Sequence, residues 1–533
     1  MTGLADHLLI APIVVPMIAG AAMILIGERR RNLVALVGLV STITLLLLAG
    51  TLLALANEPT VRIYRLGDWP SLFGIVLVLD RLSAVMLGLA AVLGFSAFLF
   101  SLGRWHRAGA FFHPLFQFQL MGLNGAFLTG DLFNLFVFFE VMLAASYGMA
   151  LHGSGVARVR AGLHYLVVNL LASLLFLVGV SVVYGIAGTL NMADLALRMR
   201  DIVAEDRGLL ETGLAVMGIA FLVKAAMWPM GFWLPPTYAA ATTPAAAILS
   251  ILSKVGIYSV LRVWLLLFGG EAGASAGFGA NWLLVGGLLT IAFGTIAVLA
   301  TQNLPRLAGA SVLISSGTLL AAIGAGQVAV TGGALYYMVS SVLAIGAFFL
   351  LIELVERGRE VGADVLAVTR AAFGAREEEE ELEEQEVVGV VIPGTLAILG
   401  VAFMTCALLL AGLPPLSGFL AKFTMLSAVL GPEGEPVHRT ASALMIGFIV
   451  SGFATVIAMV RTGIDVFWTN PVRRPPRIGV VEIGPIALLL LLCAALTAGA
   501  GPAMGYMQAA ARELHTPVAY LHGVFTGRPD NPR

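Results

Sequence analysis

Long apolar stretches of about twenty residues follow one another along this chain, separated by short polar connections. A bilayer core about 30 Å thick is crossed by a helix of about 20 apolar residues, so each stretch predicts a membrane-spanning helix. The predicted fold class is therefore an all-α integral membrane protein. We predict fourteen spans, at 8–26, 33–56, 77–101, 114–130, 131–151, 163–187, 212–235, 244–268, 281–300, 307–326, 331–356, 394–430, 440–461 and 484–508.

Two of these spans contain residues that interrupt helices. The seventh includes WPMGFWLPP (228–236) and the twelfth includes GLPPLSG (412–418). Proline removes a backbone donor and clashes with the preceding turn, and a break at membrane depth needs protein or water to satisfy the freed groups. The predicted helix-breaking residues are Pro229, Pro235, Pro236, Pro414 and Pro415.

The two broken spans lie five spans apart, as the corresponding helices of inverted-repeat transporters do. We therefore expect two inverted five-helix repeats, made of spans 4–8 and 9–13. The predicted segments are 1–113 with spans one to three, 114–268 with the first repeat, 281–461 with the second repeat, and 484–533 with the last span and a C-terminal tail.

Almost all of the positively charged residues are arginines. The chain has 27 arginines but only three lysines, Lys224, Lys254 and Lys422, and each lysine lies in or beside an apolar stretch. A charge at the centre of a span costs about 2.5–3.5 kcal/mol on insertion scales. A lysine near a helix end could instead extend its ammonium to the membrane surface. Because a buried lysine can lose its proton and an arginine cannot, this usage favours a proton path.

A carboxylate also falls inside a span. Glu140 lies in LFNLFVFFEVM (132–142), with no charged neighbour in sequence. It is either a protonated, structurally paired group or a proton carrier facing a wet interior. Asp80, beside Arg81 at the edge of the third span, is expected to form a local ion pair.

Further polar residues inside the spans could support such a path. His164, which opens the sixth span, is the histidine best placed for it. Hydroxyl groups could hold water, although small polar residues are also common where membrane helices pack together. The candidate serines are Ser250, Ser253, Ser315, Ser316, Ser340 and Ser341.

Composition excludes several classes of protein. Charged residues make up 11% of the chain against about 25% in soluble domains, and hydrophobic residues make up 59%. The net charge of −1 gives no indication of a nucleic-acid partner. Two cysteines, Cys406 and Cys493, form neither a zinc nor an iron–sulfur set. With no nucleotide-binding or zinc-protease motif either, we expect no cofactor, no metal and no catalytic subunit of a redox or ATP-driven enzyme.

The arginines also predict an orientation. With the N-terminus outside, sixteen arginines fall on inside loops and eleven outside. This excess favours both termini outside, because cytoplasmic loops are enriched in arginine and lysine. The longest inside loop, 357–393, contains REEEEELEEQE (376–386) with eight glutamates. We interpret it as a solvated cytoplasmic linker, with a cation-gathering or docking surface as the alternative.

Several of these segments together are similar to a known family. FNLFVFFEVM around Glu140, Lys224 ahead of WP…WLPP, SKVGIY around Lys254 and GLPPLSGFLAKF around Lys422 resemble the antiporter-like membrane subunits. That superfamily includes the proton-channel subunits of respiratory complex I and subunits of Mrp-type (Pha-type) cation/proton antiporters. The stretches 113–148, 184–196 and 408–423 most resemble the D-type subunits of the Mrp antiporters.

The resemblance implies a role for each charged residue. Glu140 and Lys224 would form a charge pair that opens and closes, Lys254 would be the central protonatable residue, and Lys422 would end the path. Many relatives carry a histidine in the eleventh span, where this chain has Ser340. The connection between the two halves would then rest on water held by Ser340 and Ser341.

The resemblance also implies an assembly and a reaction. The family works as a hetero-oligomer with other membrane subunits in the bacterial cytoplasmic membrane, exchanging external protons for internal Na⁺ or K⁺ as a secondary transporter. Two alternatives remain: a proton-pumping subunit of a complex I-like dehydrogenase or membrane hydrogenase, and a scaffold subunit. No dedicated cation cage is visible, so the sequence does not distinguish Na⁺ from K⁺.

Overall fold

The computed structural model describes residues 6–58, 60–71, 74–105, 109–357, 394–430, 439–467 and 478–526. Within these ranges the structure is almost entirely helical, and 11 helices are long and apolar enough to cross a membrane. Ala11–Ile26 and Ser417–Leu430 are apolar but shorter. The all-α class is confirmed, whereas the count of fourteen spans stays a prediction. The predicted cytoplasmic loop lies outside the described residues from position 358 to 393.

The long helices follow the predicted spans closely. In chain order they are α1 (Ala11–Ile26), α2 (Arg31–Leu55), α3 (Arg81–Ser101), α4 (Phe112–Leu128), α5 (Leu132–Ala150), α6 (Val156–Ala187), α8 (Ala204–Lys224), α13 (Ala280–Ala300), α14 (Leu304–Gly324), α15 (Val328–Glu356), α17 (Gly394–Ala411), α18 (Ser417–Leu430), α19 (Arg439–Phe467) and α20 (Val480–Ala498).

Shorter elements fill the connections and the broken spans. They are α7 (Met192–Asp201), α9 (Leu234–Ala240), α10 (Thr243–Leu249), α11 (Leu252–Ser259), a π-helix (Val260–Trp264), α12 (Leu265–Phe268), α21 (Ala500–His515), α22 (Val518–Thr526), and strands β1 (Arg62–Arg65) and β2 (Val76–Leu79). The eighth predicted span is thus built from α10, α11, the π-helix and α12.

The third predicted span begins too early, because residues 77–79 belong to a strand. β1 and β2 pair antiparallel, with Arg62 opposite Leu79, and form a two-stranded hairpin. α3 begins only after Asp80, whose side chain accepts a hydrogen bond of 2.9 Å from the Ser83 backbone N–H. The Ser83 side chain accepts one from the Asp80 N–H in return, so this capping box fixes the start of the helix.

The fourteenth predicted span ends too late. α20 stops at Ala498, and residues 500–508 belong to α21, a separate helix that begins after Gly499. α21 packs against α15 and continues into α22, which contacts β1. Both ends of the described chain therefore lie on the face of the molecule that carries the hairpin. His7 Nδ1 lies 3.1 Å from the Tyr64 hydroxyl, and Ser71 donates to the Val524 carbonyl over 2.8 Å.

The opposite face gathers the connections that were predicted to lie inside. Trp105 Nε1 donates to Glu353 over 2.7 Å, and Arg158 donates to the Ala240 carbonyl over 2.7 Å. Arg357, which follows α15, pairs with Glu482 at the start of α20. These contacts join connections from both halves of the chain, so the predicted inside residues that are described here share one face.

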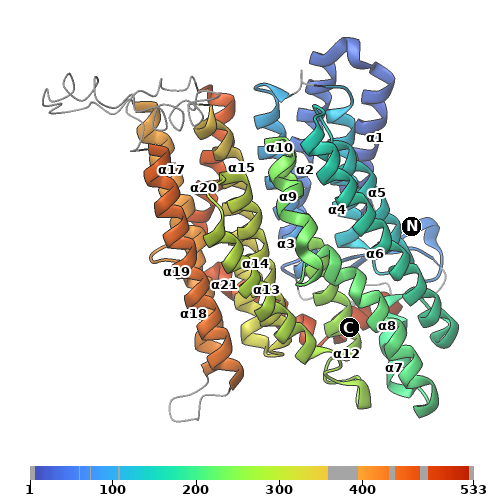
Figure 1. Cartoon of the computed structure of the whole chain (residues 1–533). Coiled ribbons are helices and arrows are strands. Elements are labelled where there is room, and N and C mark those ends of the chain that lie inside the picture. Colours follow the sequence, from blue (N-terminus) through green and yellow to red (C-terminus); the bar gives the residue numbers. More distant parts are fainter. Residues whose placement is uncertain are drawn as a thin grey trace, which may run out of the picture.

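Figure 1 shows α1, α4, α5 and α6 on the right, α17 to α20 on the left, and α13 to α15 with α9 and α10 between them. The central helices are the most buried, and α14 and α15 are enclosed by protein along most of their length. The charged residues of the site lie against this central layer.

Candidate functional site

The first helix break places Lys224 at the end of a helix inside the protein. α8 ends at Lys224, and the chain then leaves the α-helical conformation until α9. Ala226 has a φ of +58°, a left-handed conformation that costs free energy for a residue with a Cβ. The Trp228 N–H is satisfied from another helix, by the Thr290 hydroxyl of α13 at 2.8 Å.

The break lies at Pro229, not at all three predicted prolines. Pro235 and Pro236 fall in the first turn of α9, where the missing N–H of proline costs no hydrogen bond. These two residues start a new helix and do not interrupt one.

The second break also separates two helices, but its lysine lies in the helix that follows the gap. α17 ends at Ala411, Gly412 has a φ of +74°, and α18 begins at Ser417, so Pro414 and Pro415 lie in the gap. Lys422 is 6% exposed and its Nζ donates to the Ala411 carbonyl over 3.0 Å. Its ammonium therefore satisfies a carbonyl that the end of α17 leaves free.

Glu140 and Lys224 lie near each other without closing an ion pair. The Glu140 carboxylate accepts a hydrogen bond from Ser173 of α6. Lys224 Nζ lies 4.7 Å from the centre of the Phe139 ring, and none of the described carboxylates comes within 4 Å of it. The pair that the family resemblance implies is open in this structure.

A small cavity connects the end of α8 with α11. It has a volume of about 20 Å³ and is lined by Lys224, Tyr165 and Asn169 on one side and by Leu252 and Val255 of α11 on the other. A cavity needs about 10–15 Å³ on this measure to hold a water molecule, so it has room for about one. Lys224, Tyr165 and Asn169 line it with polar groups, and the side chains that α11 contributes are apolar.

The close approach of these two helices depends on Gly256. A Cβ at this position would lie 2.4 Å from the Ala225 nitrogen and 2.6 Å from the Phe221 carbonyl oxygen. Only a residue without a side chain lets α11 cross α8 at the break.

Lys254 lies at the centre of the site. It is 0% exposed, and its Nζ has one hydrogen-bond partner among the described residues, the Ser316 hydroxyl of α14 at 3.4 Å. No carboxylate in the described part of the chain pairs with it. A buried ammonium with one weak partner is costly to keep charged, which favours a group that exchanges its proton.

Five serines extend from Lys254 toward Lys422, and we call them the serine bridge: Ser315, Ser316, Ser340, Ser341 and Ser417. Ser315 of α14 donates to Ser341 of α15 over 3.0 Å. Ser340 is 2.7 Å from Ser417, the first residue of α18, and the same helix carries Lys422. A hydroxyl both donates and accepts, so a chain of them can pass a proton.

The serine bridge has internal space as well as contacts. A cavity of about 10 Å³ lies between α14, α15, α17 and α19, lined on its polar side by Ser315, Tyr337, Ser340, Ser341 and Thr455. This volume is at the lower limit for one water molecule. The predicted role of Ser340 and Ser341 in holding water stays a prediction, and this cavity is where such a water would lie.

His164 is not brought into this arrangement. It is exposed on α6, on the same stripe as Val167, Leu171 and Leu174, which are also exposed. The neighbouring Tyr165 and Asn169 are buried and face the Lys224 cavity. The helical repeat therefore turns His164 away from the buried lysines.

An ionic cluster at the hairpin face corrects the expected Asp80–Arg81 pair. Asp80 binds Arg262 of the π-helix through two hydrogen bonds, one of them 2.7 Å long. Arg81 instead pairs with Glu513 of α21. Neither Arg262 nor Glu513 was predicted from the sequence as a member of a site, because both are distant in sequence from their partners. The position of Arg262 at the end of a predicted membrane helix could nevertheless have indicated that it has a buried partner.

The described residues contain no group of three or more histidine, cysteine or acidic side chains that could hold a metal ion. The chemistry available from the site residues is that of carboxylate, ammonium and hydroxyl groups, all of which can exchange protons.

Sequence comparisons show which known proteins this chain is similar to. Residues 129–434 match the family described as NADH:quinone oxidoreductase/Mrp antiporter, TM. The chain is 56% identical over 535 residues to a probable K(+)/H(+) antiporter subunit of the D type from Rhizobium meliloti (strain 1021), covering 99% of each chain. It is 31% identical over 526 residues to the corresponding Na(+)/H(+) antiporter subunit of Alkalihalophilus pseudofirmus, covering 97% of this chain and 99% of the relative.

Solved structures share the fold. A chain of the Mrp complex from Dietzia sp. DQ12-45-1b matches with a TM-score of 0.82 at 24% identity, covering 98% of this chain and 100% of that one. A chain of respiratory complex I from Thermus thermophilus with bound NADH matches with a TM-score of 0.75 at 21% identity, covering 96% and 99%. At these identities the likeness concerns the fold alone.

Proposed function

We infer the function of this chain from its family: it belongs to the NADH:quinone oxidoreductase/Mrp antiporter family of membrane proteins. It is a secondary transporter subunit, not a catalytic enzyme, and it works with other membrane subunits in a multisubunit Na⁺ or K⁺/proton antiporter. A pumping role in a complex I-like complex has less support. The relatives that cover the whole chain are named antiporter subunits, whereas the complex I likeness is one of fold.

Its part in the antiporter is to move protons through buried side chains and water. The observation that carries this proposal is the serine bridge: two hydroxyl pairs, 3.0 and 2.7 Å apart, lie between the buried lysines Lys254 and Lys422. Glu140 and Lys224 lie at one end of the path, and Lys224 lines the one-water cavity beside α11. Each site can load and release a proton without a cofactor.

The open Glu140–Lys224 pair supports a switching role. A carboxylate near an ammonium favours its charged form, and distance weakens that effect. When Lys224 approaches Glu140 it holds its proton, and when it moves toward the cavity it can pass the proton to water and on to Lys254. In this structure the ammonium lies 4.7 Å from the centre of the Phe139 ring.

We also propose that the two repeats have the boundaries predicted from the sequence. Residues 114–268 and 281–461 each contain one broken span with a lysine beside the break, Lys224 in the first and Lys422 in the second. Two such units related by inversion would place the two lysines at matching points of two half-paths.

The site of action is the bacterial cytoplasmic membrane. Support for the orientation comes from the arginine bias and from the gathering of Arg158 and Arg357 on one face, with both ends of the described chain on the other. The face of the hairpin and of α21 is then outside.

The test uses the whole complex in inverted membrane vesicles, with Na⁺- or K⁺-dependent dequenching of a pH dye as the readout. Glu140→Gln should abolish exchange at unchanged complex yield, and Glu205→Gln, an exposed carboxylate at the start of α8, should leave it unchanged. Exchange above about half of the wild-type rate in Glu140→Gln would refute the proposal. Exchange that requires NADH and a quinone would favour the complex I-like role.

A further inference from the structure

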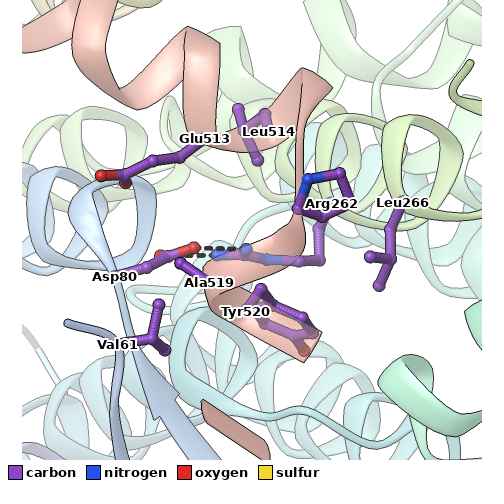
Figure 2. A pocket seen from close by; sticks show the side chains of 9 residues that line it. Val61, Asp80, Arg262, Leu266, Glu513, Leu514, Ala519 and Tyr520 are labelled. Atoms are coloured by element: carbon purple, nitrogen blue, oxygen red, sulfur yellow. Dashed lines mark hydrogen bonds and ion pairs between the residues drawn. The ribbon is translucent and has the colours of Figure 1, made fainter. Parts of the chain in front are cut away.

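A cluster of charges lies on the hairpin face, on the same helical run as Lys254. Asp80 and Arg262 are 7% and 5% exposed and hold each other through two hydrogen bonds. Arg262 also lies 5.5 Å from the Tyr258 ring centre and 5.2 Å from that of Tyr520 on α22. Figure 2 shows this pair head to head, with the Glu513 carboxyl group on the Asp80 side.

The cluster continues toward Lys254 along one helix. Lys254, Tyr258 and Arg262 follow one another at intervals of four residues, and all three are buried. Arg262 donates to the Tyr258 hydroxyl over 3.4 Å. Arg262 lies in the π-helix, an irregularity that is rare in helices and common at functional sites.

The cluster also opens toward water. A cavity of about 20 Å³, enough for about one water molecule, lies between Asp80, Arg262, Tyr520 and Glu513. Glu513 is 27% exposed, so its carboxylate contacts solvent on one side and the cavity on the other. None of the residues already placed in the path occupies this position.

We propose that Glu513 is the proton-uptake group of the first half of the chain, taking protons from water on the hairpin face and passing them by the cavity beside Asp80–Arg262 toward Tyr258 and Lys254. The proposal rests on the proposed function and adds an access point to it. The step is a proton transfer: water gives a proton to the Glu513 carboxylate, and the carboxyl group gives it to the cavity water. The Asp80 carboxylate offsets the charge of Arg262, which would otherwise repel the proton.

The proton affinity of Glu513 suits this role. Burial raises its pKa from the ordinary value of 4.5 to about 7, Asp80 acts in the same direction, and Arg81 and Arg262 oppose the rise. A transfer group works best when its pKa is near the working pH. The charged and titratable groups that face Glu513 lie on four elements. They are Arg81 and Asp80 at the start of α3, Arg262 on the π-helix, Tyr506 on its own helix and, across the cavity, Tyr520 on α22.

The pKa of Glu513 determines the direction in which exchange should depend on pH. Below pH about 7 Glu513 is mostly protonated, and above it the group is increasingly ionised and less often carries a proton inward. Exchange should therefore fall as the pH on the hairpin side rises above about 7. Removing Arg81, which opposes the rise in pKa, should move this fall to higher pH.

The experiment measures exchange by the assembled complex in right-side-out vesicles, with the pH on each side varied separately. Glu513→Gln should slow exchange about tenfold or more and remove the dependence on hairpin-side pH between about 6 and 8. Arg81→Gln should shift that dependence to higher pH. The matched control is Glu58→Gln, which removes an exposed carboxylate paired with Arg62 on the same face and should change neither rate nor profile.

If Glu513→Gln keeps the wild-type pH profile, whatever its exchange rate, the proposal is overturned and the carboxylate is only a structural partner of Arg81. If that variant fails to assemble, Arg81→Gln decides, and an unshifted profile overturns it. The two proposals fail separately. Loss of exchange in Lys254→Arg with a normal Glu513→Gln variant refutes only the uptake role, and normal exchange in Lys254→Arg refutes the proton path itself.

Discussion

Replacing Ser340 by alanine should slow exchange while the complex still assembles. In this structure the Ser340 and Ser417 hydroxyls are each other's partner at 2.7 Å, and both side chains are buried. The substitution removes the contact that joins α15 to α18 in the serine bridge. A hydrogen bond of this kind contributes about 0.5–1.5 kcal/mol, and each 1.36 kcal/mol in a barrier is tenfold in rate, so we expect exchange to fall about three- to tenfold.

A double-mutant cycle makes this prediction specific. Ser417→Ala removes the same contact from the other side, so the double variant should be about as slow as either single one. Ser427→Ala is the control, because Ser427 is exposed on the same helix and donates only to the Thr424 carbonyl over 3.0 Å. The assay is dye dequenching in inverted vesicles, normalised to complex yield on a native gel. Wild-type rates in both single variants, or independent effects that multiply in the double one, would refute a shared proton contact.

Three further predictions follow from the same geometry. Lys422→Arg should reduce exchange as much as Lys254→Arg or somewhat less, since Lys422 lies near the end of the path and also donates to the Ala411 carbonyl. Full exchange activity in Lys422→Arg would show that Lys422 is not part of the path. Gly256→Ala should lower the melting temperature or yield of the complex by forcing α11 off α8, at about 1–3 kcal/mol, whereas Gly208→Ala, with open space around it, should be neutral or stabilising. A cysteine at Glu271, which is 70% exposed, should react with an impermeant thiol reagent in intact cells and one at Ser154 should not, and the reverse would invert the orientation.

The span pattern could be predicted from the sequence because apolar length and helical period carry it directly. The errors occurred where a local hydrogen bond decides the boundary. The capping box at Asp80 moves the start of α3, and Gly499 separates α20 from α21. Neither signal is visible in hydropathy, which averages over about twenty residues.

The burial of the candidate lysines could be predicted from the sequence, their contacts could not, and their role in a site stays a prediction. Lysine usage singled out Lys224, Lys254 and Lys422, all three of them buried, because the cost of a buried charge is a property of the residue type. The partners depend on the fold: Asp80 binds Arg262, which is 182 positions away, and not its neighbour Arg81. His164 was misjudged for the same reason, since its helical phase and not its residue type places it outside the path. Ser417 was missed because its role depends on meeting Ser340 from a different helix.

The central claim is that Lys254 works by losing and regaining its proton, and the variant Lys254→Arg tests it most directly. Arginine keeps the positive charge and can still donate to Ser316, but it does not release its proton in an accessible pH range. The measurement is the exchange rate of the assembled complex in inverted vesicles, against its yield on a native gel, with Arg160→Lys on the exposed surface of α6 as the control. We predict loss of most exchange at wild-type yield in Lys254→Arg and none in the control. Near-normal exchange in Lys254→Arg would mean that this residue holds a charge and moves no proton, and would contradict the account.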